Sequence, residues 1–134
     1  MATVSKSGVP SLSTPNPSDN SRLGPFMPGE DLAAGDACYI KSDGKVWRSI
    51  GAAANAANEV DGFCVEGITL ASRQPVTLYN HVTLRYGSGL TPGARYFLSA
   101  TAAGQLDTAV GTYALKHLAV VLPDGERIRV KGTL

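Results

Sequence analysis

The chain of 134 residues lacks long apolar runs and an excess of either charge. No apolar run approaches the roughly 20 residues that span a bilayer, and the opening MATVSKSGVPSLSTPNP contains no apolar core of a secretion signal. We therefore expect neither membrane insertion nor classical secretion. With 12 basic and 11 acidic residues, the net charge of +1 is far from the concentrated positive charge that nucleic acid attracts. We expect no direct nucleic-acid partner.

Residues typical of catalytic and metal sites are also scarce. The two histidines, His81 and His117, lie far apart in the sequence, and no carboxylate stands at a spacing that would orient either one. Together with Cys38 and Cys64 they resemble a zinc-ligand set, but the close paired spacing of structural zinc sites is missing. Without a secretion signal, the cysteines are expected to be reduced thiols in strands. We expect no enzyme, no cofactor and no metal.

The sequence does contain many glycines and short alternating runs. Fifteen glycines and only 17% charged residues are typical of a turn-rich β domain. The alternation predicts strands at 37–41, 46–48, 60–68, 75–79, 82–86, 115–122 and 127–131, a hairpin turn at 42–45, and a loop with at most one helical turn at 52–57. The predicted fold class is all-β, a small barrel or sandwich.

One phrase occurs twice. Residues 32–46 read LAAGDACYIKSDGKV and residues 90–106 read LTPGARYFLSATAAGQL. In both, a Leu stands three residues before a Gly, an aromatic residue follows four after that Gly, and a second Gly precedes a basic or amide residue and then an apolar one. Each phrase predicts a turn, a strand, a second turn and a short strand, followed by a further apolar strand. We expect two similar hairpin units that face each other and share one core.

Residues 1–28 differ in composition from the rest of the chain. They hold five of the eight prolines, six serines and one aromatic residue. Such a segment buries too little apolar surface to offset its own ordering entropy. We therefore divide the chain into an extended Pro/Ser-rich N-terminal arm at 1–28 and a β-barrel-like domain at 29–134.

The end of this arm is more apolar than its beginning. Leu23, Phe26 and Met27 are large apolar side chains held beside the fixed backbone of Pro25 and Pro28. A solvated linker would not need them. We expect this cluster to dock on a partner protein or on a neighbouring copy of the chain.

The last run alternates in charge as well as in hydropathy. Ile128 and Val130 face one side, whereas Arg127, Arg129 and Lys131 face the other. Two interpretations stay open: a solvated face, or a contact surface for acidic groups.

Several of these motifs resemble those of a known family. The relevant segments read DLAAGDA at 31–37, YIK at 39–41, DGKV at 43–46, VDGF at 60–63, YG at 86–87, LTPG at 90–93, YFL at 96–98 and GQL at 104–106. Over roughly 29–130 the chain resembles the small head-decoration, or cement, proteins of tailed bacteriophages.

The resemblance implies a compact β-barrel-like body on the outside of an assembled capsid, made in the cytoplasm of the bacterial host. Such a protein bridges neighbouring major-capsid-protein subunits and resists the outward pressure of packaged DNA. Contacts between copies of the chain would then form a homo-oligomer, with a trimer favoured over a dimer. The family has no catalytic residues to carry over. The expected partner contacts are Leu23, Pro25, Phe26, Met27, Arg127 and Arg129.

Two other classes of function stay open. A carbohydrate-binding or fibre-like β module displayed on a virion would use Trp47, Tyr79, Tyr86 and Tyr96 as a ligand platform, although core and cross-strand packing explains these aromatic residues equally well. A small hydrolase would need one of the two histidines as its base, and the sequence offers no partner residues for that role.

Overall fold

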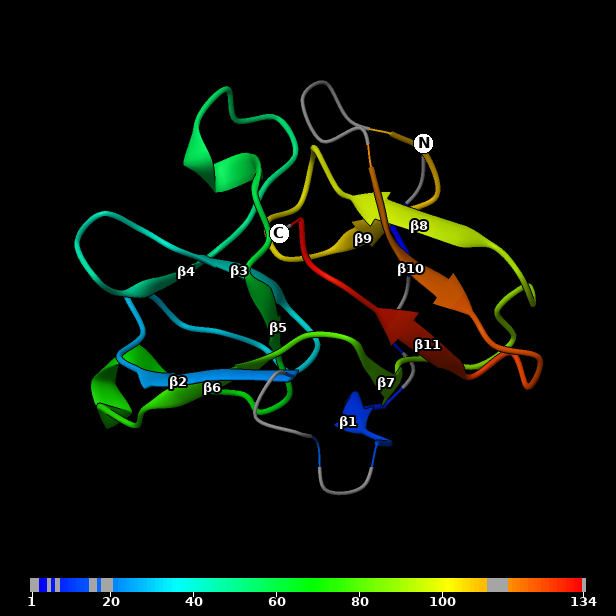
Figure 1. The fold of residues 1–134 in the computed structure, drawn as a ribbon, viewed down its shortest axis with the longest axis horizontal. Helices are drawn as coiled ribbons and strands as arrows, with labels where there is room; N and C mark the ends of the chain where they lie inside the picture. Colours follow the sequence, from blue (N-terminus) through cyan, green and yellow to red (C-terminus); the bar gives the residue numbers. More distant parts are fainter. Residues whose placement is uncertain are drawn as a thin grey trace.

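The protein folds into two antiparallel β-sheets, as the alternating pattern predicts (Figure 1). The computed structural model describes residues 3, 4, 6, 8–14, 17, 21–110 and 116–133. In Figure 1 the five-stranded sheet lies on the left and the six-stranded sheet on the right. The sheets do not close into a single barrel, so the arrangement is sandwich-like.

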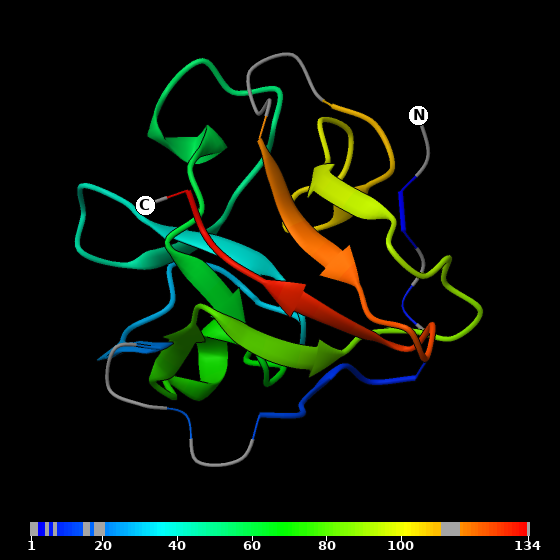
Figure 2. The same ribbon diagram turned by 45° about the vertical axis from the view of Figure 1, so that its right-hand side comes forward.

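The six-stranded sheet contains, in order, β1 (Ser11–Leu12), β7 (Val82–Arg85), β11 (Arg127–Val130), β10 (His117–Val121), β8 (Arg95–Leu98) and β9 (Leu106–Asp107). Figure 2 shows β11, in red, running between β10 and β7. The last strand is therefore an interior strand of this sheet with one exposed face, and it is not an edge strand.

The five-stranded sheet contains, in order, β2 (Arg22–Phe26), β6 (Val76–Tyr79), β5 (Gly62–Cys64), β3 (Ala37–Ile40) and β4 (Val46–Arg48). Two short 3-10 helices, η2 (Ala56–Asn58) and η3 (Leu70–Ser72), lie in its connections. The strand expected at 60–68 is confirmed only for the three residues of β5. The expected single helical turn near 52–57 corresponds to η2.

The two repeated phrases form matching units, one in each sheet. The first phrase contributes β3 and β4 and is followed by β5, whereas the second contributes β8 and β9 and is followed by β10. The neighbour order is the same in both, β5-β3-β4 and β10-β8-β9. The prediction of two matching hairpin units is confirmed.

The register of the two hairpins also matches. Ile40 pairs with Val46 in the first unit, and Leu98 pairs with Leu106 in the second. In each unit, one partner follows the aromatic residue of the phrase and the other is the second residue after the second Gly. The four glycines of the two phrases account for the matching turns. All four have positive φ, between 75° and 84°, which residues with a side chain rarely adopt.

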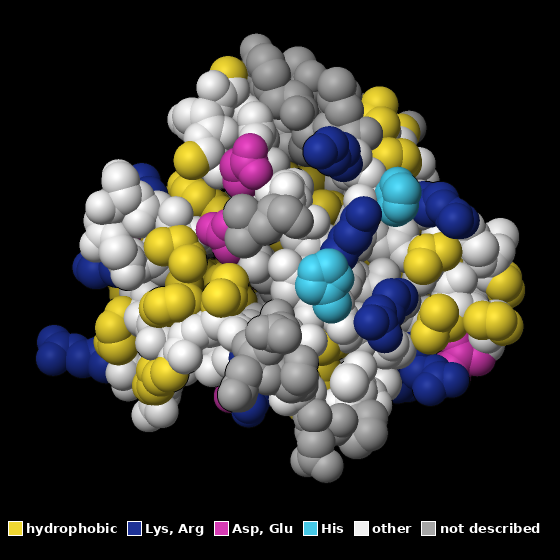
Figure 3. All heavy atoms as spheres, in the orientation of Figure 1, with side chains coloured by type: hydrophobic (Ala, Val, Ile, Leu, Met, Phe, Trp, Pro, Cys, Tyr) yellow, Lys and Arg dark blue, Asp and Glu magenta, His cyan; other side chains and the backbone are white. Residues whose placement is uncertain are grey.

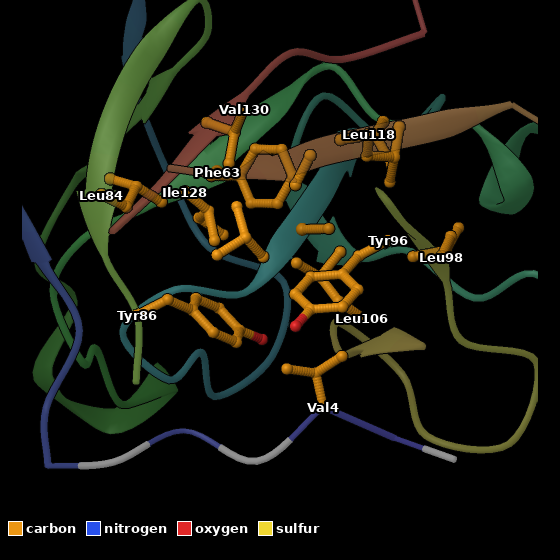
Figure 4. Packing of buried hydrophobic residues seen from close by; sticks show 14 of the residues in the cluster. Val4, Phe63, Leu84, Tyr86, Tyr96, Leu98, Leu106, Leu118, Ile128 and Val130 are labelled. Carbon is orange, nitrogen blue, oxygen red and sulfur yellow. The ribbon is translucent and has the colours of Figure 1, made fainter. Parts of the chain in front are cut away.

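Two apolar clusters fill the protein. The larger is dominated by the six-stranded sheet and includes Phe63, Tyr86, Leu98 and Val130, all buried (Figure 4). Val4 points from the N-terminal segment into this cluster, towards Tyr96 (Figure 4). The smaller cluster belongs to the five-stranded sheet and contains Leu32, Cys38, Val46, Cys64, Ile68, Val76 and Leu78.

The described residues of the N-terminal segment are extended, as expected, but they lie along the sheets of their own chain. Thr3 bridges to Asp107 at one edge of the six-stranded sheet, and β1 pairs with β7 at the other edge. In the five-stranded sheet, β2 pairs with β6, and Pro28 bridges to Val46 of β4 on the opposite edge. The segment therefore pairs with both edges of both sheets.

Backbone hydrogen bonds explain why the N-terminal segment pairs with the sheet edges. Sheet edges present unpaired N–H and C=O groups, and a segment of low apolar content can still satisfy them. For example, Val4 N donates to Leu106 O over 2.8 Å, and Val46 N donates to Met27 O over 2.9 Å. Composition alone counts side chains and leaves these backbone partners out.

Candidate functional site

The apolar end of the N-terminal segment is only partly available to a partner. Leu23 and Phe26, in β2, pack against the smaller apolar cluster, opposite Leu78 and Val76 of β6. Pro25 is exposed, and Met27 is 45% exposed. The expected docking cluster thus divides into two residues that bind their own chain and two that face solvent.

Met27 borders an open hollow of about 590 Å³ together with Pro28, Leu70 and the side chains of Lys45 and Arg73. Leu70 is 49% exposed and lies in η3, which no sequence pattern singled out. Hydrophobic side chains gather on this side of the molecule, over the five-stranded sheet, in Figure 3. We call the exposed Met27 and Leu70, together with Lys45 and Arg73 that border them, the apolar surface.

The outer face of β11 separates the two arginines that the sequence singled out. Arg127 Nε donates to Asp124 Oδ2 over 2.6 Å, so its charge already has a partner. Asp124 also accepts hydrogen bonds from the backbone N–H groups of Glu126 and Arg127. These two bonds, and then the bond from the Arg127 side chain, lower the pKa of the Asp124 carboxyl group to about 2. Within the described part of the chain, Arg129 has no carboxylate within 4.0 Å.

The structure brings together two histidines that lie far apart in the sequence. His81 precedes β7 and His117 opens β10, and both line a hollow of about 130 Å³ with Arg129 of β11 and Lys131, the residue after that strand. Figure 3 shows the histidines, in cyan, among Lys and Arg side chains on one face. We call these four residues the basic surface. The alternation of the last strand indicated its arginine and lysine, but no local signal could have placed the histidines beside them.

The four aromatic residues proposed as a ligand platform do not share a surface. Tyr86 is fully buried and Tyr96 is nearly so, both in the larger apolar cluster (Figure 4). Burial, and then the nearby Asp36 charge, raise the pKa of the Tyr86 phenol far above its ordinary value. Trp47 is half-buried, with Lys41 Nζ 4.5 Å from its ring centroid and its own Nε1 donating to Asp43. Tyr79, in β6, is half-buried against the larger apolar cluster, so packing explains the three tyrosines.

The two cysteines are free thiols, buried in β3 and β5. Cys64 Sγ donates to Ala33 O over 2.9 Å, and Cys38 Sγ donates to Asp36 O over 3.5 Å. The contact with the Cys64 thiol, and then burial, raise the pKa of Cys38. Backbone carbonyl groups accept the hydrogen bonds of both thiols, and both side chains are buried, so the two cysteines are core residues.

Two kinds of site are missing from the residues that the structure describes. None of their helices is long and apolar enough to cross a membrane. In the same residues, no group of three or more His, Cys, Asp or Glu side chains is arranged to hold a metal ion. A scan for protein families and searches for similar proteins and similar solved structures found no match to this chain.

Proposed function

We propose that the protein binds the outer surface of a phage capsid and stabilises it by bridging neighbouring major-capsid-protein subunits. The observation that carries the proposal is that one folded body exposes two surfaces of different chemistry, on different sheets. The apolar surface adjoins the five-stranded sheet and the basic surface lies on the six-stranded sheet. A bridge needs two contacts held at a fixed separation, and a sandwich of two packed sheets supplies that.

The apolar surface supplies a contact by burial. Met27 and Leu70 each expose about half of their surface, and completing their burial is worth about 1 kcal/mol per side chain. The hydrogen bonds between Val46 N and Met27 O and between Gly29 N and Val46 O fix the backbone on both sides of Pro28. Met27 is therefore held on ordered backbone, which lowers the entropic cost of binding a partner.

Two weak contacts give tight binding when one folded body carries both. Once the first surface is bound, the second meets its partner at a high effective concentration. Each contact alone is weak, whereas the pair holds two capsid subunits together. Stabilisation of the capsid, as distinct from mere attachment, requires both.

The N-terminal segment contributes to this function through the fold. Its described residues pair with sheet edges of their own chain, and Val4 and Leu12 pack on the larger apolar cluster. Deleting 1–28 would remove β1 and β2 together with the first residue of the apolar surface. Such a deletion cannot separate partner binding from folding, so point variants are needed.

The test uses two paired variants and heads assembled from the major capsid protein of the same virus. Met27→Ser/Leu70→Ser removes the two apolar side chains of the apolar surface, and Arg129→Gln/Lys131→Gln removes two charges of the basic surface. Val9→Ser is the apolar control, because Val9 is 76% exposed and lines neither hollow. Occupancy is measured by co-sedimentation, and stabilisation by the temperature at which the heads open.

Each paired variant should require more protein for full occupancy, and heads decorated with either should lose the gain in heat resistance. The Val9→Ser variant should behave as the wild type in both assays. Wild-type occupancy and heat resistance with either paired variant would contradict the proposal.

A further inference from the structure

The basic surface has the features of a built binding site. The four side chains come from three neighbouring segments: the turn before β7, the start of β10, and β11 with the residue that follows it. All four are exposed, and the hollow is also lined by apolar residues of β10 and β11, of which Val120 is half-buried and lies opposite Arg129 on the outer face. Donor groups thus stand beside apolar side chains.

The backbone at one side of this hollow is strained and held in place. His81 has φ +55°, a left-handed conformation that is uncommon for a residue other than glycine. The buried side chain of Asn80 fixes it: Oδ1 accepts His81 N over 3.0 Å and Gly132 N over 2.6 Å. One amide oxygen therefore ties His81 to the residue after Lys131, and so sets the two sides of the hollow relative to each other.

The charges on this sheet face divide into paired and unpaired groups. Arg85 lies 3.7 Å from Glu126, and Arg127 lies 2.6 Å from Asp124. For Arg129 and Lys131 no carboxylate lies within 4.0 Å among the described residues. The face therefore neutralises its basic residues at one end and leaves them available at the other, where the hollow is.

The size of the hollow and the number of charges select the ligand. About 130 Å³ is well below the roughly 300–1,000 Å³ of sites that enclose small molecules. Nucleic-acid binding relies on a track of several phosphate contacts, about 6–10 in well-studied cases, and the chain as a whole carries only +1. One or two carboxylate side chains, projecting from a protein surface, match both the volume and the charge.

We infer that the hollow formed by His81, His117, Arg129 and Lys131 binds acidic side chains of a partner protein. The guanidinium and ammonium groups supply permanent positive charge, the imidazoles supply further N–H donors, and the apolar lining accepts the methylene groups of a Glu side chain. The inference rests on the proposed function only for the choice of a protein partner. Its test contains no capsid, so either proposal can fail without the other.

The test is a nuclear magnetic resonance titration of the full chain with hexaglutamate, with hexaglutamine as the uncharged control. Inorganic phosphate and a single-stranded oligothymidylate serve as competing ligand classes. The Arg129→Gln/Lys131→Gln variant removes two charges from the hollow. Lys45→Gln/Arg73→Gln removes the same charge from the apolar surface and is the matched control.

Hexaglutamate should shift the signals of His81, His117, Arg129 and Lys131, and hexaglutamine should not. The Arg129→Gln/Lys131→Gln variant should bind about tenfold more weakly, and the Lys45→Gln/Arg73→Gln variant should change affinity by less than about twofold. No shift at these residues up to about 10 mM peptide, or equal losses in the two variants, overturns the inference. Tighter binding of phosphate or of the oligonucleotide at the same residues overturns the choice of an acidic protein partner.

Discussion

Lys6 Nζ lies 3.0 Å from Asp36 Oδ1. Asp36 is fully buried, and the Lys6 side chain is only 15% exposed. Asp36 belongs to the first repeated phrase, yet it packs against Gly104 of the second, and Ala37 N donates to Gly104 O over 2.9 Å. A lysine from the N-terminal segment therefore neutralises a buried carboxylate that stands where the two units meet.

Lys6→Met should destabilise the protein by about 3 kcal/mol, because it leaves a buried carboxylate without its cation. Urea unfolding followed by tryptophan fluorescence measures the change. Lys45→Met is the control, since Lys45 is exposed and should change stability by less than about 0.5 kcal/mol. Equal stabilities of the two variants would show that the ion pair is not formed in solution.

Gly104→Ala should destabilise the protein more than Gly93→Ala does. Gly93 and Gly104 are the first and second glycines of the second repeated phrase. Both residues have positive φ, +75° and +80°, so each variant loses about 1 kcal/mol through backbone strain. Only at Gly104 does an added Cβ meet another group, 2.9 Å from Asp36 Cγ, whereas nothing lies within 4 Å at Gly93. Overpacking adds about 1–3 kcal/mol, and thermal unfolding of the two variants measures the difference. Equal losses would contradict the packing described.

The cysteines should be unreactive in the folded protein. Both thiols are buried, and the raised pKa of Cys38 keeps that group protonated at neutral pH. At pH 8 a thiol reagent should label the native protein at least about 100-fold more slowly than the urea-unfolded protein. Native labelling at the rate of the unfolded chain would exclude the buried positions.

Asp124 should make stability fall at acid pH. Its folded pKa of about 2 is below the ordinary value of 3.8, so the folded state favours the charged carboxylate. That contribution is present above about pH 4 and is lost as the pH falls towards 2. A carboxyl-carbon titration by nuclear magnetic resonance should give a midpoint near 2 for Asp124, and Asp124→Asn should flatten the stability profile in this window. A midpoint at or above 3.8 would refute the turn geometry.

The repeat could be predicted from the sequence because its signals are local. Glycines at Gly35, Gly44, Gly93 and Gly104 mark turns, and the alternation between them marks strands. The position of residues 1–28 could not be predicted from composition. The backbone groups of the described residues among them pair with sheet edges, and such pairing depends on where those edges lie after folding.

The basic surface depends on register, which no local signal specifies. His81 follows β6 of one sheet and precedes β7 of the other, so its position is set where the chain crosses between sheets. His117 reaches the same hollow because β10 lies beside β11. Arg127 and Arg129 look equivalent in the sequence, and only the turn at Asp124 distinguishes them.

The most direct test of the account is the binding of the purified full-length protein to expanded and unexpanded heads of the same virus, with its stoichiometry per capsid subunit. A protein that bridges capsid subunits should bind expanded heads at a fixed, saturable ratio and raise their opening temperature, and it should not bind unexpanded heads. Failure to bind expanded heads, or binding at no fixed ratio and without a rise in opening temperature, would contradict the proposed function.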